Sequence, residues 1–375
     1  MIEEGLKLTA YLGERARVSA GAVAGTGSGA GGRLLADAIT DVFARHELAV
    51  SLLLRGVEGF GTRGGLRTDR LLTLSEDLPL VSVAVDGRER IEAAHAEVAA
   101  LGVPGLLTLE RARLVRGKAA ASDLQSGRAP ADEETKLTVY VGRHERERDG
   151  RRPAYEAVVA ALHAGGVAGA TVLLGVDGTV DGERRRARLL GHNAAVPLMV
   201  VAVGARTRIA AVLPELDARL TRPLLTLERV QVLKRDGTGG QTPCPPTPGS
   251  PPTIKGTGGL APCPLQKLVV YAGEQSRHRG APLSPQLVRA LRSAGAAGAT
   301  SLRGIWGYHG DHAPHGDTVR QLRRRVPVVT VVVDAPERIA ALWPVVDAHT
   351  DETGLVTCEL VPVAWRGRPS PRQLA

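Results

Sequence analysis

The sequence predicts an α+β protein of three tandem domains, because one series of motifs occurs three times along the 375 residues. Each copy begins with a strand-like run ending in aromatic-x-Gly. It continues through a Gly-x-x-Gly element and a proline that opens an apolar run, and it ends on a strand with a glutamate. The first glycine of this element and the proline are 23, 22 and 23 residues apart, and the proline and the glutamate are 31, 31 and 32 apart, which indicates an internal repeat. The markers are Tyr11, Gly56, Gly59, Pro79 and Glu110 in the first copy, Tyr140, Gly175, Gly178, Pro197 and Glu228 in the second, and Tyr271, Gly304, Gly307, Pro327 and Glu359 in the third.

Within the middle copy, the apolar pattern changes period in the order β-α-β-β-α-β. Helical spacing follows the first strand, with Tyr155, Val158 and Leu162, and it returns after the third strand. Asp86 and Glu89 have capping-box spacing before the second helix of the first copy. This order is typical of a ferredoxin-like domain, a four-stranded antiparallel sheet with two helices on one face. The expected strands of the middle copy lie near residues 136 to 141, 168 to 176, 197 to 203 and 225 to 232.

The inner strands of each copy are apolar nearly throughout, as in the run from Val328 to Val333. Strands that are apolar on both faces need a cover on each side. We therefore expect the open sheet faces of the three copies to pack together around a pseudo-threefold axis, so that a monomeric chain acts as an intramolecular pseudo-trimer. The expected organisation is repeat 1 over residues 1–117 with a Gly/Ala-rich insertion at 16–32, a linker at 118–133, repeat 2 at 134–236, a Pro/Gly-rich disordered linker at 237–264, repeat 3 at 265–366 and a disordered tail at 367–375.

The composition argues against several classes of function. A net charge of +9 suits a nucleic-acid partner, but the arginines are scattered and aromatic residues make up only 3%, which leaves few side chains to stack on bases. No Walker A sequence and no Gly-x-Ser-x-Gly elbow is present, so we expect no enzyme. The sequence shows no secretory leader pattern and no apolar stretch of membrane-spanning length, so we expect a cytoplasmic protein without membrane insertion.

Two kinds of motif are candidates for binding a small anion. The Gly-x-x-Gly elements either cradle an anion with their backbone N–H groups or give the chain a sharp departure at the end of a strand. Arginine clusters in the following loops either bind phosphate or carboxylate or form a solvated flank. The candidate ligand-binding residues are Arg55, Gly56, Gly59, Gly175, Gly178, Arg303, Gly304, Gly307, Arg184, Arg188 and Arg323.

A histidine-rich loop in the third copy is a candidate metal site. His309, His312 and His315 lie close to Asp311 and Asp317, and imidazole with carboxylate suits Zn²⁺ or Cu²⁺. The spacing of three between histidines is not a standard zinc motif, and solvated loops rich in histidine are common. Metal binding by this loop is therefore the alternative function.

The motifs resemble those of the bacterial PII-like proteins known as domain-of-unknown-function family 190. The signatures are Arg55-Gly56-Val57-Glu58-Gly59-Phe60-Gly61, Ala168-Gly169-Ala170-Thr171 and Arg303-Gly304-Ile305-Trp306-Gly307, and the likeness covers everything except linkers and termini. It implies ferredoxin-like subunits that assemble as a trimer, with ligands in the clefts between them. It also implies that the loops between the second and third strands act as T-loops that reach a partner, such as a membrane transporter or channel. These loops are residues 58–78, 177–196 and 306–326.

One departure concerns the cofactor. PII proteins carry a glycine-rich phosphate loop after the third strand, whereas here the run from Val85 to Arg88 leads almost directly into the second helix. This argues against nucleotide binding in the PII manner, and the sequence names no cofactor. We therefore expect a non-enzymatic regulatory or sensor protein. It would bind a small anionic ligand, with nucleotides among the candidates, in clefts that have diverged between the repeats.

Overall fold

The first repeat forms a four-stranded antiparallel sheet with two helices in the computed structural model. The sheet order is fourth, first, third, second, that is β6-β1-β5-β2. The elements are β1 (Ile2–Gly13), α1 (Leu35–Arg45), β2 (Val50–Arg55), β5 (Pro79–Gly87), α2 (Arg88–Ala100) and β6 (Leu106–Arg116). The structure describes residues 2–18, 32–61, 65–69, 77–116, 133–180, 182–186, 196–239, 241–243, 264–309, 313–316, 326–350 and 354–366.

The second and third repeats have the same strand order. In the second repeat the sheet is β11-β7-β10-β8, and in the third it is β21-β14-β20-β17. The second repeat comprises β7 (Glu134–Gly142), α4 (Ala154–Ala164), β8 (Gly169–Val180), β10 (Pro197–Ala205), α5 (Arg206–Arg219) and β11 (Leu224–Arg229). The third comprises β14 (Leu265–Gly273), α6 (Leu283–Ser293), β17 (Ala299–Arg303), β20 (Pro327–Asp334), α7 (Pro336–His349) and β21 (Leu355–Val361), with a small pair β15 (Arg277–His278) and β16 (Ala281–Pro282) before α6.

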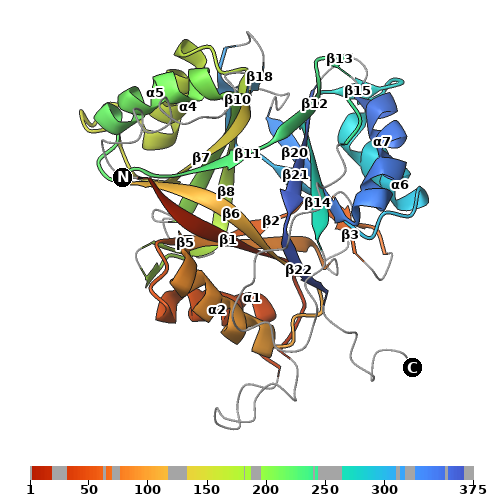
Figure 1. The fold of residues 1–375 in the computed structure, drawn as a ribbon, viewed down its shortest axis with the longest axis horizontal. Coiled ribbons are helices and arrows are strands. Elements are labelled where there is room, and N and C mark those ends of the chain that lie inside the picture. The colour runs from red at the N-terminus through yellow and green to blue at the C-terminus, as the bar shows by residue number, and fades with distance from the viewer. Residues whose placement is uncertain are drawn as a thin grey trace.

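Helices cover the outer face of each sheet. Helix α1 places Leu35, Ile39 and Phe43 on one face, at the spacing of an amphipathic helix, and all three are fully buried in the core of the first repeat. The other two repeats have separate cores of the same kind. Figure 1 shows the three helix pairs at the periphery of the molecule, with the strands inside.

The inner faces of the sheets share one further apolar cluster. All three repeats contribute to it, for example through Val83 in β5, Leu173 in β8 and Val329 in β20. All three side chains are buried. The apolar inner strands are thus covered on both faces, on one side by their own helices and on the other by neighbouring repeats.

Strands also pass from one repeat to the next in a cyclic way. After its own strand β2, the first repeat sends β3 (Glu58–Phe60) to pair with β17 of the third repeat. The third sends β18 (Trp306–His309) to β8 of the second, and the far end of β8 pairs with β2 of the first. The last strands pair the other way round the molecule. The end of β6 pairs with β11, β12 (Gln231–Arg235) with β21, and β22 (Val363–Arg366) with β6.

Four details bear on the sequence-based expectations. The prediction of a capping box at Asp86 is wrong, because Gly87 is the N-cap of α2. The Asp86 carboxylate instead accepts hydrogen bonds from the N–H groups of Ala49 and Gly87. The start of the 237–264 linker forms a short strand, β13 (Thr238–Gly239), paired with β12. Most of both linkers, residues 19–31 of the insertion and the tail at 367–375 lie outside the described residues. In the part of the chain that is described, no helix combines the length and apolar character needed to cross a membrane.

Candidate functional site

The Gly-x-x-Gly elements lie where a strand leaves its own sheet for that of a neighbour. The Gly56 N–H donates to the Pro79 carbonyl of its own repeat at 2.8 Å, and the next N–H, of Val57, donates to Ser301 of the third repeat at 2.8 Å. A side chain on the second glycine, Gly59, would collide with the backbone of β17, because its Cβ would lie 2.4 Å from the Ala299 carbonyl oxygen. Glycine is therefore required here by the close approach of two backbones.

The other two copies repeat this geometry. In the third repeat, Gly304 donates to Pro327 at 2.7 Å, and Ile305 donates across the repeat boundary to Val172 at 2.9 Å. In the second, a Cβ on Gly178 would lie 2.2 Å from the Ser51 carbonyl oxygen of the first repeat. These contacts favour the structural interpretation of the glycines, and their role in binding a ligand stays a prediction.

A cleft of about 1070 Å³ lies between the second and third repeats. The start of β8 and the middle of β10 form its wall in the second repeat. The third repeat contributes the loop after β14 and the hairpin of β18 with β19 (His315–Gly316). The predicted residues Gly307, His309 and His315 all line this cleft. The hairpin is the base of the expected T-loop of the third repeat, so this loop begins at the cleft.

The charged groups of the cleft differ in how far they are paired. The Arg235 guanidinium lies 3.1 Å from the Glu134 carboxylate, and Glu274 lies 3.1 Å from Arg303. Among the described residues, the exposed Arg277 guanidinium donates only to the Gly280 carbonyl oxygen, at 3.0 Å. His309 is hydrogen bonded to the Asp236 carboxylate. The cleft therefore presents cationic and neutral donors with few carboxylates left unpaired.

Arg235 reaches the cleft from β12 of the second repeat, and the sequence analysis did not identify it. It stands opposite Leu355 in the β12–β21 ladder. The same register places Arg116 opposite Leu224 and Arg366 opposite Leu106. An arginine six or seven residues after each repeated glutamate was the signal that could have indicated these positions.

The predicted arginines are mostly held by carboxylates. Arg55 pairs with Glu14 through two hydrogen bonds of 2.9 and 3.0 Å. Arg303 also lies 3.3 Å from Asp69 of the first repeat. Arg184 pairs with Asp177 of its own repeat and with the first-repeat residues Asp37 and Asp41. The remaining candidates Arg188, Arg323 and His312 lie outside the described residues.

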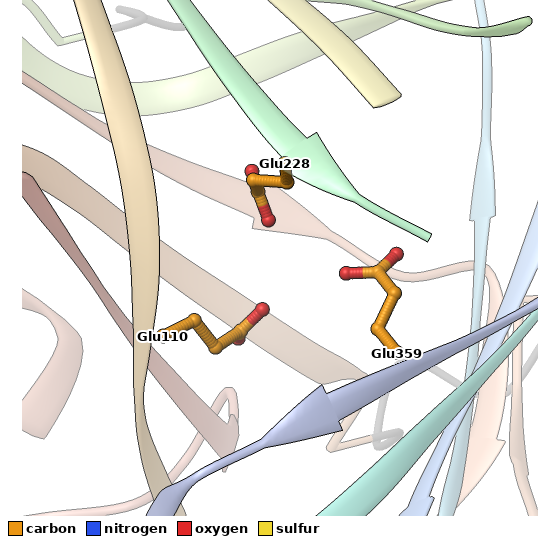
Figure 2. Close-up of side chains that lie close together, drawn as sticks. All are labelled: Glu110, Glu228 and Glu359. Atoms are coloured by element: carbon orange, nitrogen blue, oxygen red, sulfur yellow. The ribbon is translucent and has the colours of Figure 1, made fainter. Parts of the chain in front are cut away.

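The geometry brings His309 and His315 into one cleft through the pairing of their strands. One ring nitrogen of each histidine has a protein partner, since His315 Nδ1 lies 2.9 Å from the Ala313 carbonyl oxygen and His309 Nε2 contacts Asp236. A different set of potential ligands meets at the centre of the molecule. Figure 2 shows the carboxylates of Glu110, Glu228 and Glu359 directed toward one another, and these oxygens lie within 4.8 Å.

Three buried lysines neutralise these carboxylates. Each lysine faces the glutamate of its own repeat across a strand pair, at 3.0 Å for Lys7 with Glu110, 2.9 Å for Lys136 with Glu228 and 3.0 Å for Lys267 with Glu359. Each also pairs with a glutamate of another repeat, which closes an alternating ring of six charges. All six residues are at most 7% exposed. The ring balances three positive against three negative charges, so it joins the repeats without needing a metal ion.

The lysines lower the pKa of two of these carboxylates, those of Glu110 and Glu228. Burial is the largest influence on Glu228 and raises its pKa, but the ammonium groups of Lys136 and Lys7 outweigh it and hold the pKa at about 2. Burial also opposes the charge on Lys7, yet Glu110 and Glu228 together raise its pKa above the ordinary value. The lysines respond unequally: burial outweighs the attraction of Glu228 and Glu359 at Lys136 and lowers its pKa, whereas Glu110 and Glu359 outweigh burial at Lys267 and raise its pKa.

A family model, DUF190, described as "Uncharacterized ACR, COG1993", matches the chain three times, at residues 5–114, 134–232 and 265–363. Each match runs from the first to the last strand of one structural repeat. The matches together cover more than half of the chain. The chain therefore belongs to the DUF190 family and carries three tandem copies of its domain.

Proposed function

We propose that the chain is a non-enzymatic, PII-like regulatory protein whose three ferredoxin-like repeats act as an intramolecular pseudo-trimer. A small anionic ligand binds in a cleft between repeats, and the T-loops report the bound state to a partner such as a membrane transporter or channel. The strand order, the cyclic exchange of strands and the shared inner core support this arrangement.

The observation that carries the proposal is the cleft between the second and third repeats. Its volume is that of a small-molecule site, and it combines apolar walls with a few convergent polar groups. Val201 and Val203 form apolar wall, whereas Arg235 and Arg277 bring guanidinium groups. A ligand here contacts the base of the third T-loop directly, which links binding to a loop that can engage a partner.

A thermal-shift panel tests the proposal. Nucleotides, dicarboxylic acids and inorganic phosphate form one arm, and Zn²⁺ and Cu²⁺ form the other. We expect an anion to raise the melting temperature in a concentration-dependent way, because a ligand that binds only the native state stabilises it. A response to metals alone, lost in a His309→Ala and His315→Ala double variant, would favour the metal-binding alternative.

A further inference from the structure

A five-residue loop with the pattern Gly-x-x-x-Arg follows the first strand of every repeat. Its turn is the same each time: the N–H of the fourth residue donates to the carbonyl of the glycine at 3.0 Å in all three copies. The N–H of the second residue donates to the residue before the repeated proline, so this part of the loop is also shared. The loops are Gly13–Arg17, Gly142–Arg146 and Gly273–Arg277.

In the first repeat, this loop binds a carboxylate from the same chain. The N–H of the third loop residue, Arg15, donates to Asp77 Oδ1 at 2.6 Å. The Arg67 guanidinium pairs with Asp77 Oδ2 at 2.9 Å. The carboxylate lies against Gly13, where a Cβ would be 2.7 Å from Oδ2. A backbone amide, a cation and a glycine without a side chain thus form a complete site for an oxyanion.

The third repeat has the same loop, but a histidine stands in place of Arg67 and no carboxylate stands in place of Asp77. Gln275 corresponds to Arg15, and no described residue accepts its N–H. His315 corresponds to Arg67, because it stands opposite Gly307 as Arg67 stands opposite Gly59. Two residues before the proline, where the first repeat has Asp77, the sequence of the third has Arg325. The third repeat therefore replaces the acidic residue with a basic one.

In the first repeat the Asp77 carboxylate lies against Gly13. In the third repeat a movable side chain covers the corresponding position, next to Gly273. The side-chain amide of Gln275 folds back over Gly273, within 2.8 Å of where a Cβ would be. This is the end of a flexible, exposed side chain, so it can swing away. Gly273, Gln275, Arg277 and His315 all line the cleft between the second and third repeats.

We propose that the cleft takes the oxyanion of a small ligand, a carboxylate or a phosphate group, at the Gln275 N–H and His315, where the first repeat holds its own Asp77. The proposal deepens the function proposed above and rests on it. The second repeat differs again, since Glu145 of its loop accepts the N–H of Gly142 at 3.0 Å. The protein then binds one such ligand per chain, not three.

Titration of the ¹⁵N-labelled protein with inorganic phosphate, and separately with succinate, tests the position. We expect the chemical shift of the Gln275 backbone amide to change when the more tightly binding of the two anions is added. The identity of that anion distinguishes a phosphate ligand from a carboxylate ligand. His315→Ala should weaken binding about tenfold, the effect of one charged hydrogen bond. Calorimetry should give one site per chain.

Removal of the internal carboxylate provides the sharper test. Asp77→Ala frees the Arg15 N–H and Arg67, so we expect the stoichiometry to rise from one to two and the Arg15 amide to respond as Gln275 does. Glu183→Ala is the matched control, because Glu183 is also a T-loop carboxylate paired with an arginine, but its partner Arg185 belongs to the same T-loop and to none of the three five-residue loops. It should leave the stoichiometry at one.

Three results would overturn this inference and can be told apart. If an anion of the thermal-shift panel binds while the Gln275 amide stays unmoved, the ligand binds elsewhere and the regulatory function survives. If Asp77→Ala adds no site, the correspondence between the loops of the first and third repeats fails, and the regulatory function again survives. If no anion of the panel binds at all, the inference and the proposed function fail together.

Discussion

At the scale of single residues, three of the six lysines of the chain lie in the buried ring. The spacing of the repeats singled out Glu110, Glu228 and Glu359 but gave no reason to pair them with lysine. A lone strand sequence does not reveal whether a charged residue is exposed or buried, because burial depends on which other sheet covers that face. The lysines do share one signal, since each stands four residues before the repeated tyrosine.

Loss of one glutamate of the ring should destabilise the protein strongly. Glu228→Gln leaves Lys7 and Lys136 buried with one excess positive charge, and we expect a loss of about 3 kcal/mol or more in the free energy of unfolding. Glu97→Gln is the control, because Glu97 pairs with Arg45 and His46 at the surface and is 41% exposed, so its loss should cost about 1 kcal/mol at most. Urea denaturation measures both, and equal effects would contradict a special role for the ring.

Buried His95 should make the protein sensitive to mild acid. The side chain in α2 is 1% exposed, and burial lowers its pKa from 6.5 to about 4. Between these values the unfolded chain binds a proton that the folded chain does not. Stability should therefore fall as the pH drops from 6.5 to 4, by up to about 3 kcal/mol. His95→Leu should flatten this part of the profile in chemical denaturation at several pH values. An unchanged slope would show that other groups cause it.

At the scale of elements, the positions of the strands and helices followed from apolar periodicity. The strands expected near 136 to 141 and 197 to 203 match β7 and β10 within two residues. The strand expected at 225 to 232 is divided at Val230, where β11 ends and β12 leaves for another sheet. Periodicity indicates that a segment is extended but not which strand it pairs with, so the exchange between repeats could not be predicted from it.

The glycines at the crossover points should tolerate no side chain. In Gly178→Ala the new Cβ would meet the Ser51 carbonyl oxygen at 2.2 Å, which forces the two backbones apart. We expect a loss of about 2 kcal/mol or more. Gly61→Ala has no atom within 4 Å of the added Cβ and should stay within about 0.5 kcal/mol of the parent. Thermal unfolding of the two variants decides, and a tolerated alanine at 178 would refute the close approach.

At the scale of the whole molecule, the three junctions between repeats are built alike but carry different side chains. Arg184 of the second repeat bridges to Asp37 and Asp41 of the first, whereas the junction of the second and third repeats has histidines in its cleft. The sequence indicated this divergence through its unequal loops. It could not show that Arg184 is held by carboxylates from a different repeat, since these residues are more than 140 positions apart.

The chain should be a monomer in solution. The cyclic pairing uses the crossover strands of all three repeats within one chain, and a closed arrangement of this kind needs no further copies. Light scattering coupled to size exclusion should therefore give 39.3 kDa. A stable species with the mass of three chains would contradict this expectation.

The exchange of last strands has a consequence for synthesis on the ribosome. Strand β6 of the first repeat pairs with β22, which ends at Arg366, and β3 pairs with β17 of the third repeat. The first repeat is therefore exposed at two strand edges until nearly the whole polypeptide has been translated. Unpaired edges of nascent chains invite aggregation, so this protein should depend on holding chaperones during translation more than a string of independently folding domains would.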